Sequence, residues 1–212
     1  MKNLIFVSLL AVLVSCQSAY YAAWEKVGVE KRDILVDRVE DAKESQEDAQ
    51  QQFSSALDEF SQLINFKGGE LQDVYSKLKD QFEASETSAS DVSNRIDKVE
   101  SVAEALFDEW QDELEKYTNA KLKRDSQSKL RDTQRRYKSL LSAMRKAESK
   151  MPPVLSALRD NVLYLKHNLN ASAIGALQGE FNGIKNEINQ LVAEMNKAIS
   201  ESNSFISSMK SQ

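Results

Sequence analysis

The chain has 212 residues and a formal net charge of −5; 29% of its residues are charged, 8% are aromatic and two are proline. This composition is typical of long solvated helices and unlike that of a globular enzyme core. His167 is the only histidine, so a His-based metal site or catalytic triad would need two other residue classes to converge on it. The sequence has no Gly-rich phosphate loop, serine elbow or Asp/Glu cluster with metal spacing. We therefore expect no catalytic residue, no cofactor, no metal and no enzymatic activity.

The N-terminus predicts a signal peptide over residues 1–15. An apolar run from Leu4 to Val14, interrupted only by Ser8, is too short to span a bilayer and matches a signal-peptide core. Residues 13–16, Leu-Val-Ser-Cys, resemble the lipobox of bacterial lipoproteins, in which the cysteine is acylated and becomes the mature N-terminus. An ordinary signal peptide with a chance cysteine is the alternative. Because Cys16 is the only cysteine and stands at the cut position, we predict lipidation of Cys16, with an anchor and short tether over residues 16–19.

The predicted lipidation sets the expected location. Several acyl chains on one N-terminus give stable membrane anchoring, and no later stretch is apolar for the roughly 18 residues that a transmembrane helix needs. Gln17 follows the cysteine, where lipoproteins kept at the inner membrane often carry Asp. We therefore expect a lipoprotein on the periplasmic face of the outer membrane, attached through Cys16, with no nucleic-acid partner.

The first helix is predicted over about residues 20–66. Its apolar seam alternates spacings of 4 and 3, as in a coiled coil. The seam consists of Leu35, Val39, Ala42, Gln46, Ala49, Phe53, Ala56, Phe60 and Leu63. Gln46 is polar at a seam position, which can fix register at a cost in stability. The pair Gly68 and Gly69 then predicts a helix cap and a chain reversal.

The second helix is predicted over about residues 70–120. Two rows of residues, each seven apart, interleave without a slip, even through the polar run at 85–90. One row is Leu71, Leu78, Ser85, Val92, Val99, Leu106 and Glu113, and the other is Tyr75, Phe82, Ala89, Ile96, Ala103, Trp110 and Tyr117. A loop at 85–90 would have freed the second half to restart in any phase. The pattern therefore predicts one continuous helix of about 50 residues, or roughly 75 Å.

The third helix is predicted over about residues 125–169, with a kink at Pro152-Pro153. Its rows are Leu130, Tyr137, Met144, Met151 and Thr133, Leu140, Ala147, Val154. The phase jumps by one between Tyr117 and Leu130, while residues 121–126 contain neither Gly nor Pro. A tight reversal and a continuous helix with a register defect both fit this segment. We favour the reversal because it leaves four helices of comparable length.

The fourth helix is predicted over about residues 172–210. Its seam contains Ile174, Leu177, Phe181, Ile184, Ile188, Leu191, Met195, Ala198, Ser202, Phe205 and Met209. Gly175, Gly179 and Gly183 lie four apart on one face, and we interpret them as a thin packing face. The sequence thus predicts a single all-α domain over residues 20–212, an elongated antiparallel four-helix bundle or coiled coil. The alternative is a longer, open assembly of hairpins that completes its core with a second copy.

Charge is unevenly distributed along the chain. Residues 37–115 contain 22 acidic and 7 basic side chains, whereas residues 116–150 contain 12 basic and 3 acidic ones. The basic helix either neutralises its acidic neighbours or turns back at the membrane that anchors Cys16. In the second interpretation the membrane-proximal candidates are Tyr20, Tyr21, Trp24, Lys121, Lys123 and Arg124. At the opposite tip, the candidates for partner binding are Phe66, Gly68, Gly69, Lys166, His167 and Asn168, whose alternative role is that of turn and capping residues.

The segments at residues 20–40 and 162–171 resemble a family of proteobacterial proteins catalogued only as a domain of unknown function. The resemblance covers nearly the whole mature chain and implies a Gram-negative envelope protein, without an activity or ligand. Two hypotheses for function follow. The first is a coiled-coil structural or adaptor component of the cell envelope, with a protein partner or self-association. The second is a helical module that binds an apolar or lipidic ligand between its helices. A tightly filled seam would favour the first, and a buried cavity with few polar groups would favour the second.

Overall fold

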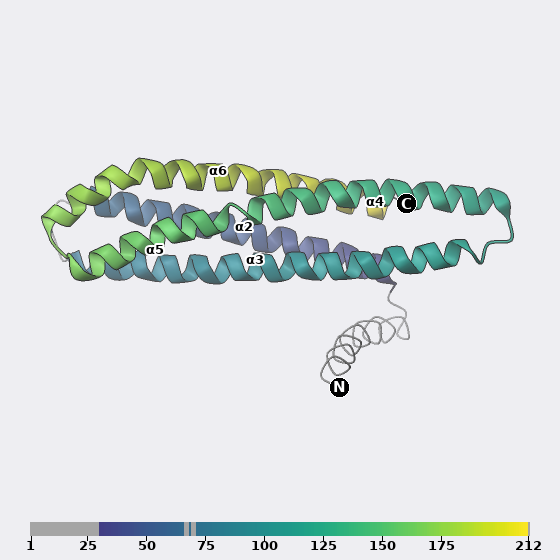
Figure 1. The fold of residues 1–212 in the computed structure, drawn as a ribbon, viewed down its shortest axis with the longest axis horizontal. Coiled ribbons are helices and arrows are strands. Elements are labelled where there is room, and N and C mark those ends of the chain that lie inside the picture. Colours follow the sequence, from purple (N-terminus) through teal and green to yellow (C-terminus); the bar gives the residue numbers. More distant parts are fainter. Residues whose placement is uncertain (1–29, 66–67, 69–70, 212) are drawn as a thin grey trace, which may run out of the picture.

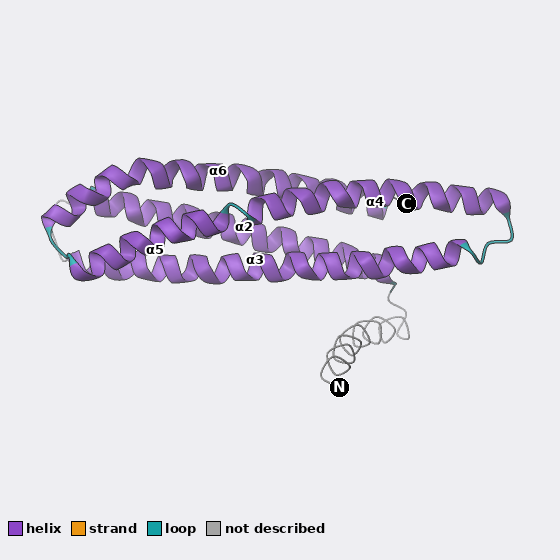
Figure 2. Ribbon diagram, viewed as in Figure 1, coloured by secondary structure: helices purple, strands orange, loops and turns teal. Residues whose placement is uncertain are grey.

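A computed structural model describes residues 30–65, 68 and 71–211 of the chain. The described residues form helices joined by short turns and contain no strand (Figure 2). The helices are α2 (Lys31–Ile64), α3 (Leu71–Leu114), α4 (Ala120–Glu148), α5 (Met151–His167) and α6 (Ala171–Lys210). The chain is therefore all-α over its described part.

The helices pack as an elongated antiparallel bundle of four shafts, in which α4 and α5 together make the third shaft (Figure 1). α2 packs beside α3 and α6, and the α4–α5 shaft packs beside the same two helices. The shafts thus form a closed ring around one core, to which all five helices contribute. This confirms the predicted antiparallel four-helix bundle.

α3 runs without interruption from Leu71 to Leu114, straight through the polar segment at residues 85–90. The seam side chain in this segment, Ser85, is fully buried and donates a hydrogen bond to the carbonyl oxygen of Gln81 at 2.7 Å. A hydroxyl satisfied by its own helix needs no partner from a neighbouring one. The polar segment is therefore part of the packed shaft, and α3 is about 66 Å long.

The predicted seam of α2 is buried along its whole length. All nine of its positions, from Leu35 to Leu63, are fully buried. Near the end of α2 the ring of Phe60 meets that of Phe181 on α6 edge to face, with ring centroids 5.6 Å apart. Alanines alternate with larger side chains along the α2 seam. The alternation allows close helix packing at the small positions and interdigitation at the large ones.

Gln46 is the one polar residue in the α2 seam, and it is fully buried. Neither its amide nitrogen nor its amide oxygen has a hydrogen-bond partner among the described residues. An unsatisfied buried amide costs about 1–3 kcal/mol. The seam is thus polar at this point without any compensating bond.

Replacing Gln46 by methionine should therefore raise the free energy of unfolding by about 1–2 kcal/mol, because the side-chain shape is kept and the unpaired amide is removed. Urea unfolding followed by circular dichroism measures the change. Gln52→Met on the same helix is the matched control, because Gln52 donates to the side chain of Gln81 at 2.7 Å and would lose that bond. A stabilisation by Gln52→Met as large as that by Gln46→Met would contradict the explanation.

The third shaft breaks at Ser149 and Lys150, just before the two prolines. Pro152 and Pro153 lie in the first turn of α5, where backbone N–H groups have no intrahelical acceptor. The kink that the sequence placed at 152–153 therefore lies a few residues earlier. The seam continues across it, with Ala147, Met151 and Val154 all buried.

Gly175, Gly179 and Gly183 do not form a packing face, contrary to the prediction. All three are exposed, and a Cβ atom added at any of them would meet no neighbouring atom within 4 Å. The core-facing side of this part of α6 is formed instead by Leu177 and Ile184. The glycines therefore lie on the outer side of the bundle, where a larger side chain would fit.

Candidate functional site

The large apolar side chains that remain exposed in the described chain all lie near the two ends of the rod. At one end are Tyr117 and Leu122, and near the other are Leu163, Tyr164 and Leu169. Between these groups the apolar positions of the shafts are buried or packed against the core. Exposed apolar groups at both ends of an otherwise well-filled bundle indicate the ends as candidate interaction sites.

At the first end, the hairpin of α3 and α4 extends beyond the rest of the bundle (Figure 1). The start of α2 lies beside residue 109, because Lys31 Nζ is 3.0 Å from Glu109 Oε1. The end of α6 lies there too, because Arg32 donates a hydrogen bond to the carbonyl oxygen of Met209. Residues beyond this level therefore project as a pair of helices.

The projecting pair has its own stabilising contacts. Trp110 Nε1 donates to Ser126 Oγ at 2.8 Å, which joins α3 to α4. Leu114 and Leu130 are buried but lie outside the main core cluster. The hairpin is thus an ordered extension with a small core of its own.

The tip of the hairpin is the turn at residues 115–119 together with the first turn of α4. Asn119 caps α4, because its side-chain oxygen accepts hydrogen bonds from the backbone N–H groups of Lys121 and Leu122. Lys123 Nζ lies 3.2 Å from Glu115 Oε2 across the turn. The chain therefore reverses here, as favoured from the sequence, but several residues earlier than the segment 121–126.

The tip changes two sequence-based assignments. α3 ends at Leu114 and not near residue 120, so Lys121, Lys123 and Arg124 belong to the start of α4. Tyr117, predicted to lie in the seam, is 40% exposed. The other membrane-proximal candidates (Tyr20, Tyr21 and Trp24) and the lipidation site Cys16 lie outside the described residues, so their placement beside the tip stays a prediction.

Two basic side chains near the end of α4 pair with acidic neighbours on both sides. Arg145 contacts Asp97 and Glu100 on α3, and Lys146 Nζ lies 3.0 Å from Glu194 Oε1 on α6. Burial alone would lower the pKa of the Arg145 guanidinium, but its hydrogen bonds to carboxylates more than offset this and raise that pKa above its ordinary value. Charge neutralisation between helices accounts for this part of the basic segment.

Tyr137 on α4 joins three helices in the core near the base of the hairpin. Its ring meets Phe107 on α3 and Phe205 on α6 edge to face, at centroid distances of 5.3 and 6.5 Å. The buried hydroxyl has no hydrogen-bond partner among the described residues. Burial first, and then the nearby carboxylates of Glu100 and Glu104, raise the pKa of Tyr137. Tyr137 is therefore a neutral packing residue.

At the opposite end, the turns that follow α2 and α5 lie close to the start of α6. Gln178 on α6 donates a hydrogen bond to the carbonyl oxygen of Ile64 at 2.9 Å. Asn168 caps the end of α5 and donates to the carbonyl oxygen of Tyr164 at 2.9 Å, which is a capping role. Gly68 adopts a left-handed φ of 138°, a conformation that favours glycine.

The remaining partner candidates at this end divide into two groups. Lys166 and His167 are exposed in the last turn of α5 and free to meet a partner. Phe66 and Gly69 lie outside the described residues. The exposed apolar side chains Leu163, Tyr164 and Leu169 lie in the same stretch as Lys166 and His167.

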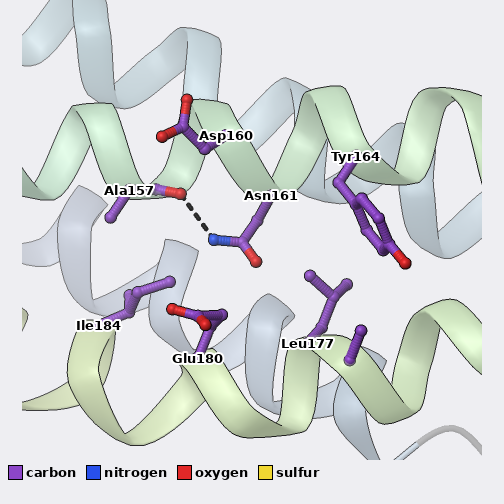
Figure 3. A pocket seen from close by; sticks show the side chains of 8 residues that line it. Ala157, Asp160, Asn161, Tyr164, Leu177, Glu180 and Ile184 are labelled. Atoms are coloured by element: carbon purple, nitrogen blue, oxygen red, sulfur yellow. Dashed lines mark hydrogen bonds between the residues drawn. The ribbon is translucent and has the colours of Figure 1, made fainter.

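A surface groove of about 490 Å³ separates α5 from α6 near this distal end (Figure 3). Its lining is Ala157, Asp160, Asn161, Tyr164, Ala176, Leu177, Glu180 and Ile184. Asn161 is 7% exposed and donates to the carbonyl oxygen of Ala157 at 2.7 Å. The groove is open to solvent and has a carboxylate on each helix, so it is not an enclosed apolar cavity.

The comparisons with known proteins give a family and nothing further. A family model described as a protein of unknown function, DUF2959, matches residues 20–209. The chain belongs to the DUF2959 family. No curated protein and no solved structure matches it.

Two further properties of this DUF2959 chain bear on its site. In the part that the structure describes, no helix has the length and hydropathy needed to cross a membrane. Within those same residues, no three His, Cys, Asp or Glu side chains are grouped so that they could hold a metal ion. The surfaces that stand out are therefore the two ends of the rod and the groove beside the distal one.

The sequence analysis did not identify Tyr117 and Leu122 as exposed residues of the tip. Tyr117 continued the seven-residue row, and Leu122 fitted no row. The available signal was the phase jump before Leu130, because a seam that loses its phase has lost the neighbours that buried it. Leu163, Tyr164 and Leu169 flank residues 166–168, which were predicted to lie at the distal tip.

Proposed function

We propose that this DUF2959 chain is a membrane-anchored structural or adaptor protein of the cell envelope, without catalytic activity. In this proposal lipidated Cys16 holds the α3–α4 end of the rod at the periplasmic face of the outer membrane, and the distal end binds a protein partner. The observation that supports it best is the confinement of the exposed large apolar side chains to the two ends of a filled bundle. A rod built in this way can join two objects at a fixed separation, about 66 Å along α3.

The filled core also favours an adaptor over a module that holds a lipidic ligand between its helices. The seam positions of α2 are fully buried, and the seams of the other helices are buried or half-buried along the shafts. A site for an apolar ligand is normally a concave, mostly apolar cavity that covers most of the ligand. The groove between α5 and α6 is open to solvent and lined in part by Asp160 and Glu180.

Photo-crosslinking tests the adaptor role. A photoreactive phenylalanine analogue replaces Tyr164 at the distal end, or Asn196 on the exposed face of α6 along the shaft as the matched control. After irradiation of intact cells, Tyr164 should give a discrete protein adduct that Asn196 does not give. The adduct should weaken when Leu163 and Leu169 are both replaced by glutamine, because these exposed side chains supply apolar contact area.

Two results would count against the adaptor role. One is an equal set of adducts from Tyr164 and Asn196, which would indicate collision without a preferred surface. The other is an adduct from Tyr164 that is indifferent to the double substitution. Far-UV circular dichroism of the Leu163→Gln, Leu169→Gln variant should match that of the unmodified protein, since both leucines are more than a third exposed.

A further inference from the structure

We propose that the tip of the α3–α4 hairpin binds the surface of an anionic membrane, as a second and non-covalent contact beside the lipid anchor. This inference rests on the proposed location of the chain at a membrane. It assigns a role to side chains that neither the core nor the distal end uses, namely Lys116, Tyr117, Lys121, Leu122 and Arg124.

The tip of the hairpin is both basic and apolar. Residues 116–124 contain four basic side chains and no acidic one. Tyr117 is 40% exposed and Leu122 is 54% exposed in the same short segment. Basic side chains bind anionic headgroups, while tyrosine and leucine enter the boundary between headgroups and acyl chains.

Most of the cations at the tip have no ion-pair partner. Further along α4, four of the seven basic side chains have a carboxylate partner, namely Lys129, Arg135, Arg145 and Lys146. The other three, Arg131, Arg136 and Lys138, have none among the described residues. Of the four basic residues in 116–124, only Lys123 has an ion-pair partner among the described residues, and that partner is Glu115 in the same turn. Unpaired cations therefore occur both at the tip and along the shaft of α4. Only those at the tip, Lys116, Lys121 and Arg124, share their segment with exposed large apolar side chains.

The tip lies at the same end of the rod as the first described helix residue. Lys31 meets Glu109, so α2 begins at the end from which the hairpin projects. From Glu109 to the end of α3 at Leu114 the hairpin rises about 7.5 Å further, and Tyr117 lies in the turn beyond it. The stretch from Cys16 to Glu30 can span at most about 50 Å. A membrane that holds Cys16 is thus within reach of the tip, and a rod standing on that membrane presents Tyr117 and Leu122 to it first.

The tip suits an anionic lipid surface better than a protein partner. A protein surface that bound three unpaired cations would need matching carboxylates, whereas an anionic bilayer offers a continuous field of phosphates. The small apolar area of two side chains also suits partial insertion better than a stable protein interface, which buries roughly 800 Å² on each partner.

A fluorescence experiment on the mature chain, residues 16–212 with Cys16→Ser, tests the contact without the lipid. A single cysteine, Leu122→Cys, carries an environment-sensitive dye, and Ser142→Cys on the exposed shaft of α4 carries the same dye as the control. Vesicles contain either phosphatidylcholine alone or phosphatidylcholine with one-third phosphatidylglycerol. We expect the emission at position 122 to shift to the blue only with the anionic vesicles, and the affinity to fall as salt rises.

Two triple variants with the same loss of charge separate a specific tip from general basicity. Lys116, Lys121 and Arg124 are replaced by glutamine in one, which leaves the pair of Lys123 with Glu115 intact. Arg131, Arg136 and Lys138, exposed further along α4, are replaced by glutamine in the other. The first should weaken vesicle binding by about tenfold or more, and the second by no more than about threefold.

The inference is overturned if the dye at position 122 shows no blue shift, if position 142 responds equally, or if both triple variants weaken binding alike. Binding of equal strength to the neutral vesicles would also overturn it. The protein in this assay carries no acyl chain, and no protein partner is present. Its failure is therefore distinguishable from a failure of lipidation at Cys16, or of partner binding at Tyr164.

Discussion

A proline at position 89 should lower the free energy of unfolding by about 3 kcal/mol or more. Ala89 lies in the middle of α3 and packs, half-buried, against the core. Proline would remove one backbone hydrogen bond of the helix and clash with the carbonyl group four residues earlier. Because α3 packs against three of the other helices along its length, a break there would disturb most of the bundle.

Thermal and urea unfolding of the Ala89→Pro variant, followed at 222 nm on the helical circular dichroism signal, measures this loss. Ala89→Gly is the control, since glycine costs only about 1 kcal/mol relative to alanine in a helix interior. If proline and glycine had the same small effect, residues 85–90 would be a linker, and the continuous shaft of α3 would be wrong.

Replacing Phe60 by alanine should cost a comparable or larger amount, about 3–5 kcal/mol. The ring is fully buried, and its removal leaves a cavity that neighbouring helices fill only in part. It also removes the edge-to-face contact with Phe181, which joins α2 to α6. The effect should appear as a lower urea midpoint with little change in the dependence of unfolding on urea.

Phe181→Ala is the matched control, because Phe181 forms the other half of the pair but is only half-buried. It should cost clearly less than Phe60→Ala, since less apolar surface returns to water. Equal losses from the two substitutions would show that the ring contact itself, and not burial in the α2 seam, governs stability at this end of the rod.

The bundle was predictable from the sequence because its shafts obey a simple packing rule. Side chains that face the core of the bundle are mostly apolar or small, and on a helix such positions recur at spacings of 4 and 3. From Leu35 to Leu63 that recurrence identified every buried seam position of α2. The same rule placed Ser85 in the core of α3 despite its polar neighbours.

The end of α3 was not predictable in the same way, because the rule holds only while all four shafts are present. Among the described residues, α2 begins and α6 ends near the level of Glu109. Glu113 and Tyr117 keep the seven-residue spacing but are exposed, while Leu114 is buried instead. A repeat by itself does not show how many neighbours a helix has at each level.

The candidate sites were only partly accessible from the sequence. The basic character of residues 116–124 is visible in the sequence, but the separation of paired from unpaired cations requires the positions of Asp97, Glu100 and Glu194 on other helices. The groove between α5 and α6 also depends on how far two helices diverge, which no local pattern encodes. Spacing alone likewise could not show that Gly175, Gly179 and Gly183 face outward.

These outward-facing glycines give α6 an uneven resistance to local unfolding. Each glycine makes helical structure about 1 kcal/mol less favourable than alanine would, and none of the three is compensated by close packing. The start of α6 therefore relies on a few core contacts, such as that of Leu177, and opens at a lower free energy than the glycine-free stretch from Ile184 onward. Within α6, local opening should therefore begin at the distal end, while the stretch from Ile184 onward stays folded.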